Sequence, residues 1–88
     1  MKITAETQSA DLASLPLYEL ASSIRRDWRN VYFGAVPYLS AMQGLDSVKD
    51  GYGCDSGRSI VNYFLSNAST WRGPVAKLVK AELKRRVK

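Results

Sequence analysis

Residues 15–30 read LPLYELASSIRRDWRN, and this stretch decides the fold. Its apolar residues recur at intervals of three and four, which places them on one side of an α-helix. They are Leu17, Leu20, Ala21, Ile24 and Trp28. Ser14 is positioned to cap the helix, and Pro16 is tolerated in the first turn because its missing N–H would have no partner there. The stretch therefore predicts an amphipathic helix over about residues 15–30, with one side packed against a core.

Two further segments have helical patterns in the middle of the chain. One begins near Pro37, and Gly44 marks its end. The other begins at about Ser56, where Asp55 or Ser56 can accept a hydrogen bond from the first free amides. Residues 66–70, SNAST, have weak helix propensity, so this helix should loosen there and the chain should turn.

A last helix opens at Gly73-Pro74, because proline suits the first turn of a helix. Its inward side is predicted to hold Val75, Leu78, Val79, Leu83 and Val87. No pair of strands with a hairpin signal is present. The sequence predicts an all-α fold, a compact single domain of three to four short helices around one core. We expect residues 14–88 to form this helical domain and residues 1–13 to form a flexible N-terminal segment.

Composition restricts the kind of protein. The chain has 88 residues, of which 45% are hydrophobic and 24% charged, as expected for one ordinary globular domain. It has one cysteine and no histidine, so we expect no disulfide framework, no bound metal and no cofactor. No apolar run approaches the length of a membrane span, and the first residues lack the apolar segment of a secretory signal. We therefore expect a cytoplasmic protein with no membrane partner.

The loop before the third predicted helix resembles a phosphate-binding loop at first sight. Residues 50–59 read DGYGCDSGRS, and Gly57-Arg58-Ser59 stands where such a loop has Gly-Lys-Ser. The first glycine of that motif should stand five positions before Gly57, but Tyr52 is there. The spacing thus favours a connector that ends in a helix cap. A weak anion site remains an alternative, since free amides of a helix start would meet Arg58.

The sequence offers no set of residues for catalysis. Without histidine, a serine or cysteine nucleophile would need an unusual base. Cys54 stands beside Asp55, whose negative charge would raise the pKa of the thiol. No spacing forces two carboxylates to converge. We predict that the protein is not an enzyme and has no catalytic residues.

Charge is concentrated at the C-terminal end. Residues 1–73 have equal numbers of basic and acidic side chains, whereas the last fifteen residues carry the whole net charge of +5. The last helix could therefore bind nucleic-acid phosphates, and the alternative is a solvated helix face. The candidate nucleic-acid-binding residues are Arg25, Arg26, Arg29, Lys77, Lys80, Lys84, Arg85, Arg86 and Lys88.

A second candidate surface is the aromatic junction around the loop and the third and last predicted helices. Tyrosine, tryptophan and arginine are the residues enriched at the energetic centres of protein interfaces. The candidate protein-binding residues are Tyr52, Arg58, Tyr63, Trp71 and Arg72. For Trp71 the alternative is burial in the core, because large aromatic side chains supply much of the buried area of a small domain.

Three segments resemble those of a set of small uncharacterised all-α proteins encoded by actinobacterial phages and prophages. They are LASSIRRDW (20–28), YFGAVPYL (32–39) and YGCDSGRSIVNYFLSNASTWRG (52–73), and the resemblance covers about residues 12–87. It implies a phage context, in which compact proteins bind and alter a host or phage macromolecule. It carries over no functional residue.

Taken together, these patterns predict a small, non-enzymatic binding protein that docks on and modulates an unidentified host or phage protein. The alternative is a nucleic-acid-binding protein that uses the basic C-terminal helix.

Overall fold

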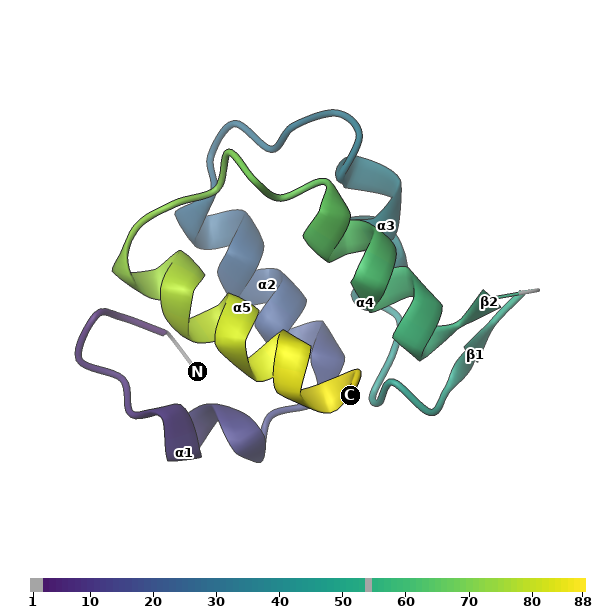
Figure 1. Cartoon of the computed structure of the whole chain (residues 1–88), viewed down its shortest axis with the longest axis horizontal. Coiled ribbons are helices and arrows are strands. Elements are labelled where there is room, and N and C mark those ends of the chain that lie inside the picture. The colour runs from purple at the N-terminus through teal and green to yellow at the C-terminus, as the bar shows by residue number, and fades with distance from the viewer. Residues whose placement is uncertain (1–2, 54) are drawn as a thin grey trace.

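The computed structural model describes residues 3–53 and 55–88, apart from the side chain of Tyr52. Within these residues the chain forms five helices and one short pair of strands (Figure 1). In chain order they are α1 (Ser9–Ala13), α2 (Leu17–Asp27), α3 (Val36–Met42), β1 (Gly51–Tyr52), β2 (Asp55–Ser56), α4 (Gly57–Ser66) and α5 (Pro74–Arg86). The mainly helical fold is as predicted from the sequence.

The number of helices differs from the predicted three to four because α1 lies within residues 1–13. Leu12 on α1 is fully buried, and Ile3 also belongs to the core. Arg86 of α5 donates a hydrogen bond to the carbonyl oxygen of Leu12 at 2.7 Å. A helix of one and a half turns contributes too few apolar positions to give a periodic signal, so only tertiary packing identifies it.

Helix α2 has the predicted apolar side but a different cap. Ser14 does not cap α2, and its hydroxyl donates to the carbonyl oxygen of Asp11 instead. The first amides of α2, those of Leu17 and Tyr18, donate to the carbonyl oxygens of Asp46 and Leu45, both at 2.9 Å. The chain after α3 thus closes the start of α2, which fixes these two helices relative to each other.

The strand pair is absent from the sequence prediction. β1 and β2 are antiparallel, with Gly51 opposite Ser56 and Tyr52 opposite Asp55. Gly53 has a φ of +60°, a conformation that glycine adopts at little cost. Two residues in each strand are too few to show the alternation that predicts a strand. Cys54 lies outside the described residues.

The start of α4 shows that the loop before it is a connector. Ser56 caps the helix as predicted, since its Oγ accepts from the Ser59 amide at 3.1 Å. The amides of Gly57 and Arg58 donate to the carbonyl oxygens of Asp50 and Val48, at 2.7 and 2.9 Å. These amides are therefore already bonded within the protein, and the alternative of an anion site at this helix start is wrong.

Three aromatic rings form the centre of the core. Trp28 stacks on Trp71 with ring centroids 5.9 Å apart, and both meet Phe64 edge-on. Around them α2 and α5 lie side by side, and α3 packs against α4 on the other side of the molecule (Figure 1). The whole domain measures 37 × 27 × 20 Å. In the part of the chain that the structure describes, no helix is both long enough and apolar enough to cross a membrane.

Candidate docking surface

Two long segments of the chain carry no charged side chain. Residues 30–45 and residues 59–71 contain no Asp, Glu, Lys or Arg, although 24% of the chain is charged. The first segment contains α3 and the second contains most of α4, and these two helices pack against each other. The fold thus joins two uncharged segments into one surface, which we call the uncharged face.

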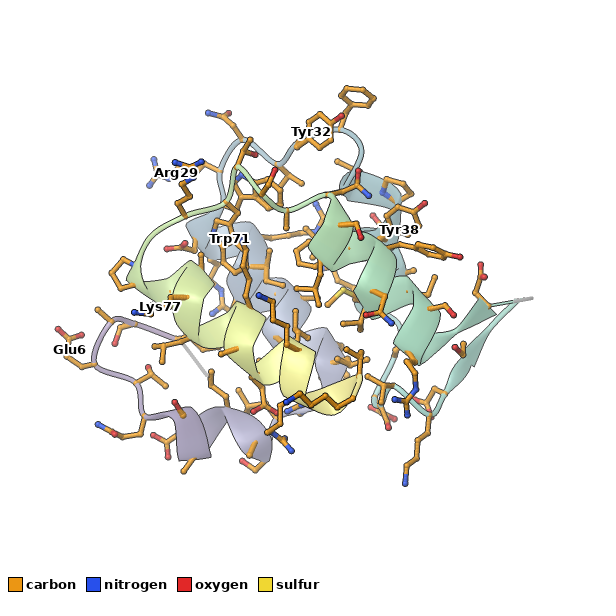
Figure 2. The ribbon with its side chains drawn as sticks, viewed as in Figure 1. Glu6, Arg29, Tyr32, Tyr38, Trp71 and Lys77 are labelled. Atoms are coloured by element: carbon orange, nitrogen blue, oxygen red, sulfur yellow. The ribbon has the colours of Figure 1, made fainter. Side chains whose placement is uncertain are left out.

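The loop between α2 and α3 projects two aromatic residues from this face. Ala35 is fully buried and Val31 is packed against the core, so they anchor both ends of the loop. Between them lie Tyr32, which is 43% exposed, and Phe33, which is 79% exposed. Their ring centroids are 4.8 Å apart, and Figure 2 shows Tyr32 at the outer edge of the molecule. Phe33 is the most exposed of the large apolar side chains that the structure describes.

Gly34 lets this loop lie close to the end of α4. A Cβ atom at Gly34 would lie 2.6 Å from Cε2 of Tyr32 and 2.8 Å from Oδ1 of Asn67. Asn67 in turn donates through Nδ2 to the carbonyl oxygen of Tyr63 at 2.8 Å. The close approach at Gly34 therefore makes the loop and α4 one continuous surface.

Helices α3 and α4 add further aromatic area. The rings of Tyr38 on α3 and Tyr63 on α4 have centroids 5.3 Å apart. Tyr38 is half-buried, while Tyr63 is 47% exposed. Val36, at the start of α3, is also exposed. Tyrosine in this setting offers a large rigid ring together with a hydroxyl group that remains available to a partner.

The chemistry of the uncharged face is that of a protein interface. Interface centres are depleted in charged residues and enriched in tyrosine and other aromatic residues. The two segments that form the face contribute no carboxylate, lysine or arginine of their own, so their side chains offer apolar contact and neutral hydrogen bonds. Among residues 3–53 and 55–88 no group of three potential ligands is placed to hold a metal ion.

The five predicted protein-binding residues do not form one site. Tyr63 is exposed on the uncharged face, but Trp71 is only 2% exposed and lies in the core. Arg58 donates hydrogen bonds to the carbonyl oxygens of Val87 and Lys88 at 2.9 and 3.1 Å, so its guanidinium group caps the C-terminal end of α5. Arg72 is exposed just before α5, and the side chain of Tyr52 lies outside the described residues.

Several of the predicted nucleic-acid-binding residues are bonded within the protein, while Lys77 and Lys80 line one hollow beside the start of α5. Arg25 reaches α3, where Nε donates to Gln43 at 2.7 Å and Nη2 donates to Ser40 at 2.9 Å. Arg86 is largely buried between Glu82 and the end of α1, and Arg85 is also paired with Glu82. Exposed cations remain at Arg29, Lys77, Lys84 and Lys88.

Lys80 and Glu82 have perturbed acid–base properties because of their positions on α5. Burial lowers the pKa of Lys80, and the positive charges of Lys84 and Arg72 lower it further. Burial alone would raise the pKa of Glu82, but hydrogen bonds and charge from Arg85 and Arg86 together bring this pKa below its ordinary value. Both charged groups are held by hydrogen bonds within the protein.

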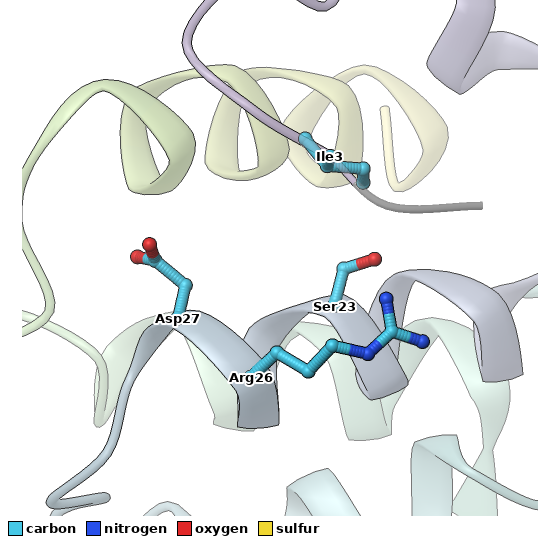
Figure 3. A pocket seen from close by; sticks show the side chains of 4 residues that line it. All are labelled: Ile3, Ser23, Arg26 and Asp27. Carbon is cyan, nitrogen blue, oxygen red and sulfur yellow. The ribbon is translucent and has the colours of Figure 1, made fainter.

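Arg26 lines a small cavity between α2 and the N-terminal segment. Figure 3 shows it with the other lining residues, Ile3, Ser23 and Asp27. The volume of the cavity is about 80 Å³. Ser23 is 3% exposed, and its Oγ has no hydrogen-bond partner among the described residues. The space is large enough for water, which could satisfy this hydroxyl group.

No known protein family, no curated protein and no solved structure matches this chain. Function is therefore inferred from the surface.

Sequence reasoning missed Tyr32, Phe33 and Val36, which are exposed on the uncharged face. The signal that could have identified them is the absence of charge over residues 30–45, because an ordinary solvated segment of this length contains charged residues.

Proposed function

We propose that this chain is a small, non-enzymatic binding protein that docks on another protein through the uncharged face. The observation that supports this most strongly is the exposure of Phe33 and Tyr32 within a segment that contains no charged residue. Both ends of the loop that carries them are anchored in the core, through Val31 and Ala35. A partner would therefore meet a surface that is already formed. Preformed aromatic contacts are those that contribute most to binding, since little conformational entropy is lost.

The distribution of charge supports a protein partner over a nucleic acid for this surface. A polyanion binds mainly through lysine and arginine side chains, and the two segments of the uncharged face contribute none. Arg25, which reaches α3 from α2, is bonded there to Gln43 and Ser40. The predicted basic surface along α5 is less favourable than its sequence implies, because Arg85 and Arg86 are bonded to Glu82. Lys80 is bonded to main-chain oxygens.

The resemblance to small proteins of actinobacterial phages and prophages suggests the class of partner. In that setting the partner is a host or phage protein whose activity changes when this chain is bound. Docking through apolar contacts suits such a role, because it requires no chemistry from the bound domain.

The test is affinity capture with three matched forms of the tagged protein from lysate of an actinobacterial host. The first is the wild type, and the second carries Tyr32→Ser and Phe33→Ser. The third carries Tyr18→Ser, which removes a tyrosine of similar exposure, 42%, outside the uncharged face. A protein captured by the wild type and the Tyr18 variant, but lost with the double variant, would support the proposal.

The dissociation constant of that purified partner should then rise by about tenfold or more for the double variant, as for loss of an interface hot spot. Equal capture by all three forms, with the folded state of each verified by circular dichroism, would contradict docking through this face.

A further inference from the structure

A shallow hollow lies beside the start of α5. Its volume is about 290 Å³. The residues that line it are Trp71, Arg72, Gly73, Ala76, Lys77 and Lys80. Half of them are cationic and none is acidic.

Lys80 is held in place at this hollow. Its Nζ donates to the carbonyl oxygens of Ala68 and Trp71 at 2.7 and 2.6 Å, and it lies 5.8 Å from the centre of the Trp71 ring. The ammonium group is thus a fixed positive charge. Arg72 and Lys77 are exposed at the rim, where their side chains are accessible to a ligand.

The electrostatics around Lys80 favour an anion. Besides burial, the groups that lower the pKa of Lys80 are two cations, Lys84 and Arg72. Of these two cations Arg72 also lines the hollow, and a bound anion there would offset its repulsion with Lys80. Helix α5 also begins here at Pro74, so the positive end of its dipole adds to the same field.

We propose that this hollow binds a phosphate group, with Arg72 and Lys77 as ligands and Lys80 as a fixed charge. Arginine can donate two parallel hydrogen bonds to phosphate oxygens, and lysine supplies a compact charge. Trp71 is too deeply buried to stack on a base, so the hollow recognises the phosphate and not the base attached to it. This site is independent of docking through the uncharged face.

The test is a titration of the whole protein followed by the backbone amide signals of Gly73, Ala76 and Lys77 in ¹H–¹⁵N NMR spectra. Three probes distinguish the source of the phosphate: inorganic phosphate, adenosine monophosphate and a short thymidine oligonucleotide. Saturable shifts with all three indicate a site for any phosphate group. Tighter binding of the oligonucleotide, with a salt dependence, would assign the phosphate to a nucleic-acid backbone.

The decisive comparison uses two double variants with the same net charge. Arg72→Gln with Lys77→Gln should weaken binding of every probe by about tenfold, or about 1.4 kcal/mol. Lys49→Gln with Lys88→Gln removes two exposed cations elsewhere and should change binding by less than about twofold, since distant surface charges are screened. Equal losses in both variants, or no saturable shift of these three amides, would overturn the site.

Discussion

Trp71 donates a hydrogen bond through Nε1 to Oδ2 of Asp27 at 2.8 Å. The contact joins the segment before α5 to the last residue of α2, across 44 residues of sequence. The same indole ring stacks on Trp28, the residue that follows Asp27. One polar bond and one ring stack therefore hold the end of α2 against the chain that leads into α5.

Removing the acceptor of this bond should destabilise the fold. Asp27→Ala would leave the N–H group of a buried indole without a partner, at a cost of about 1–3 kcal/mol in the free energy of unfolding. Asp27→Asn retains an acceptor oxygen in nearly the same place and should lose less. Urea unfolding of both variants, followed by tryptophan fluorescence, measures the difference. Equal stability of Asp27→Ala and the wild type would show that the bond makes no net contribution.

The sequence alone was sufficient to predict the helices that have a long apolar side. The periodicity of residues 15–30 predicts α2, and the Ser56 cap and the Gly73-Pro74 pair predict the starts of α4 and α5. The remaining features depend on contacts between distant segments. Helix α1 is stabilised by burial of Leu12 and by Arg86, and the start of α2 is closed by carbonyl groups after α3.

Position 57, at the start of α4, should not tolerate any residue larger than glycine. A Cβ atom there would lie 2.7 Å from the carbonyl oxygen of Ser47 and 3.0 Å from Cα of Val48, and both are main-chain atoms that cannot turn away. Gly57→Ala should therefore lower the free energy of unfolding by about 1–3 kcal/mol. Gly51→Ala is the control, because a Cβ atom at Gly51 would meet nothing within 4 Å. Thermal unfolding of the two variants should separate them, and similar melting temperatures would contradict the close contact at Gly57.

Glu82 should make stability depend on pH in the acid range. Its carboxylate is buried and bonded to Arg85 and Arg86, and its pKa in the folded protein is below the ordinary value of 4.5. A carboxyl group with a lowered pKa stabilises the fold above its unfolded pKa, and this contribution is lost as the pH falls through the folded value. Glu82→Gln should therefore cost about 1–3 kcal/mol at pH 7 and less at low pH, by the loss of charged hydrogen bonds.

Urea unfolding between neutral and acid pH provides the measurement. Glu6→Gln removes an exposed carboxylate and is the matched control. If the difference between wild type and Glu82→Gln stayed constant across this range, the carboxylate of Glu82 would not be the group that titrates with unfolding.

The candidate site was less predictable than the fold. Tyr63 was identified by residue type, but the same reasoning selected Trp71, which packs in the core. Residue type alone does not separate an interface tryptophan from a core tryptophan, because both bury a large ring. The position of Phe33 depends on two anchors, Val31 and Ala35, whose burial appears only once α3 packs against α4.

Gly34→Ala should alter the uncharged face while leaving the fold intact. The new Cβ atom would meet Cε2 of Tyr32 at 2.6 Å and Oδ1 of Asn67 at 2.8 Å, and both atoms are at the ends of side chains that can rotate. We expect the free energy of unfolding to change by no more than about 0.5 kcal/mol, as for an ordinary surface substitution. The Tyr32 ring should move away from its place beside Phe33, which nuclear Overhauser effects between the two rings would report.

Gly44→Ala is the control, because its Cβ atom would lie at an ordinary distance of 3.6 Å from the carbonyl oxygen of Ala41. Since the proposed docking surface depends on the position of Tyr32, Gly34→Ala should also weaken partner binding, and Gly44→Ala should not. Unchanged ring contacts together with unchanged partner binding would show that the surface does not need the close approach at Gly34.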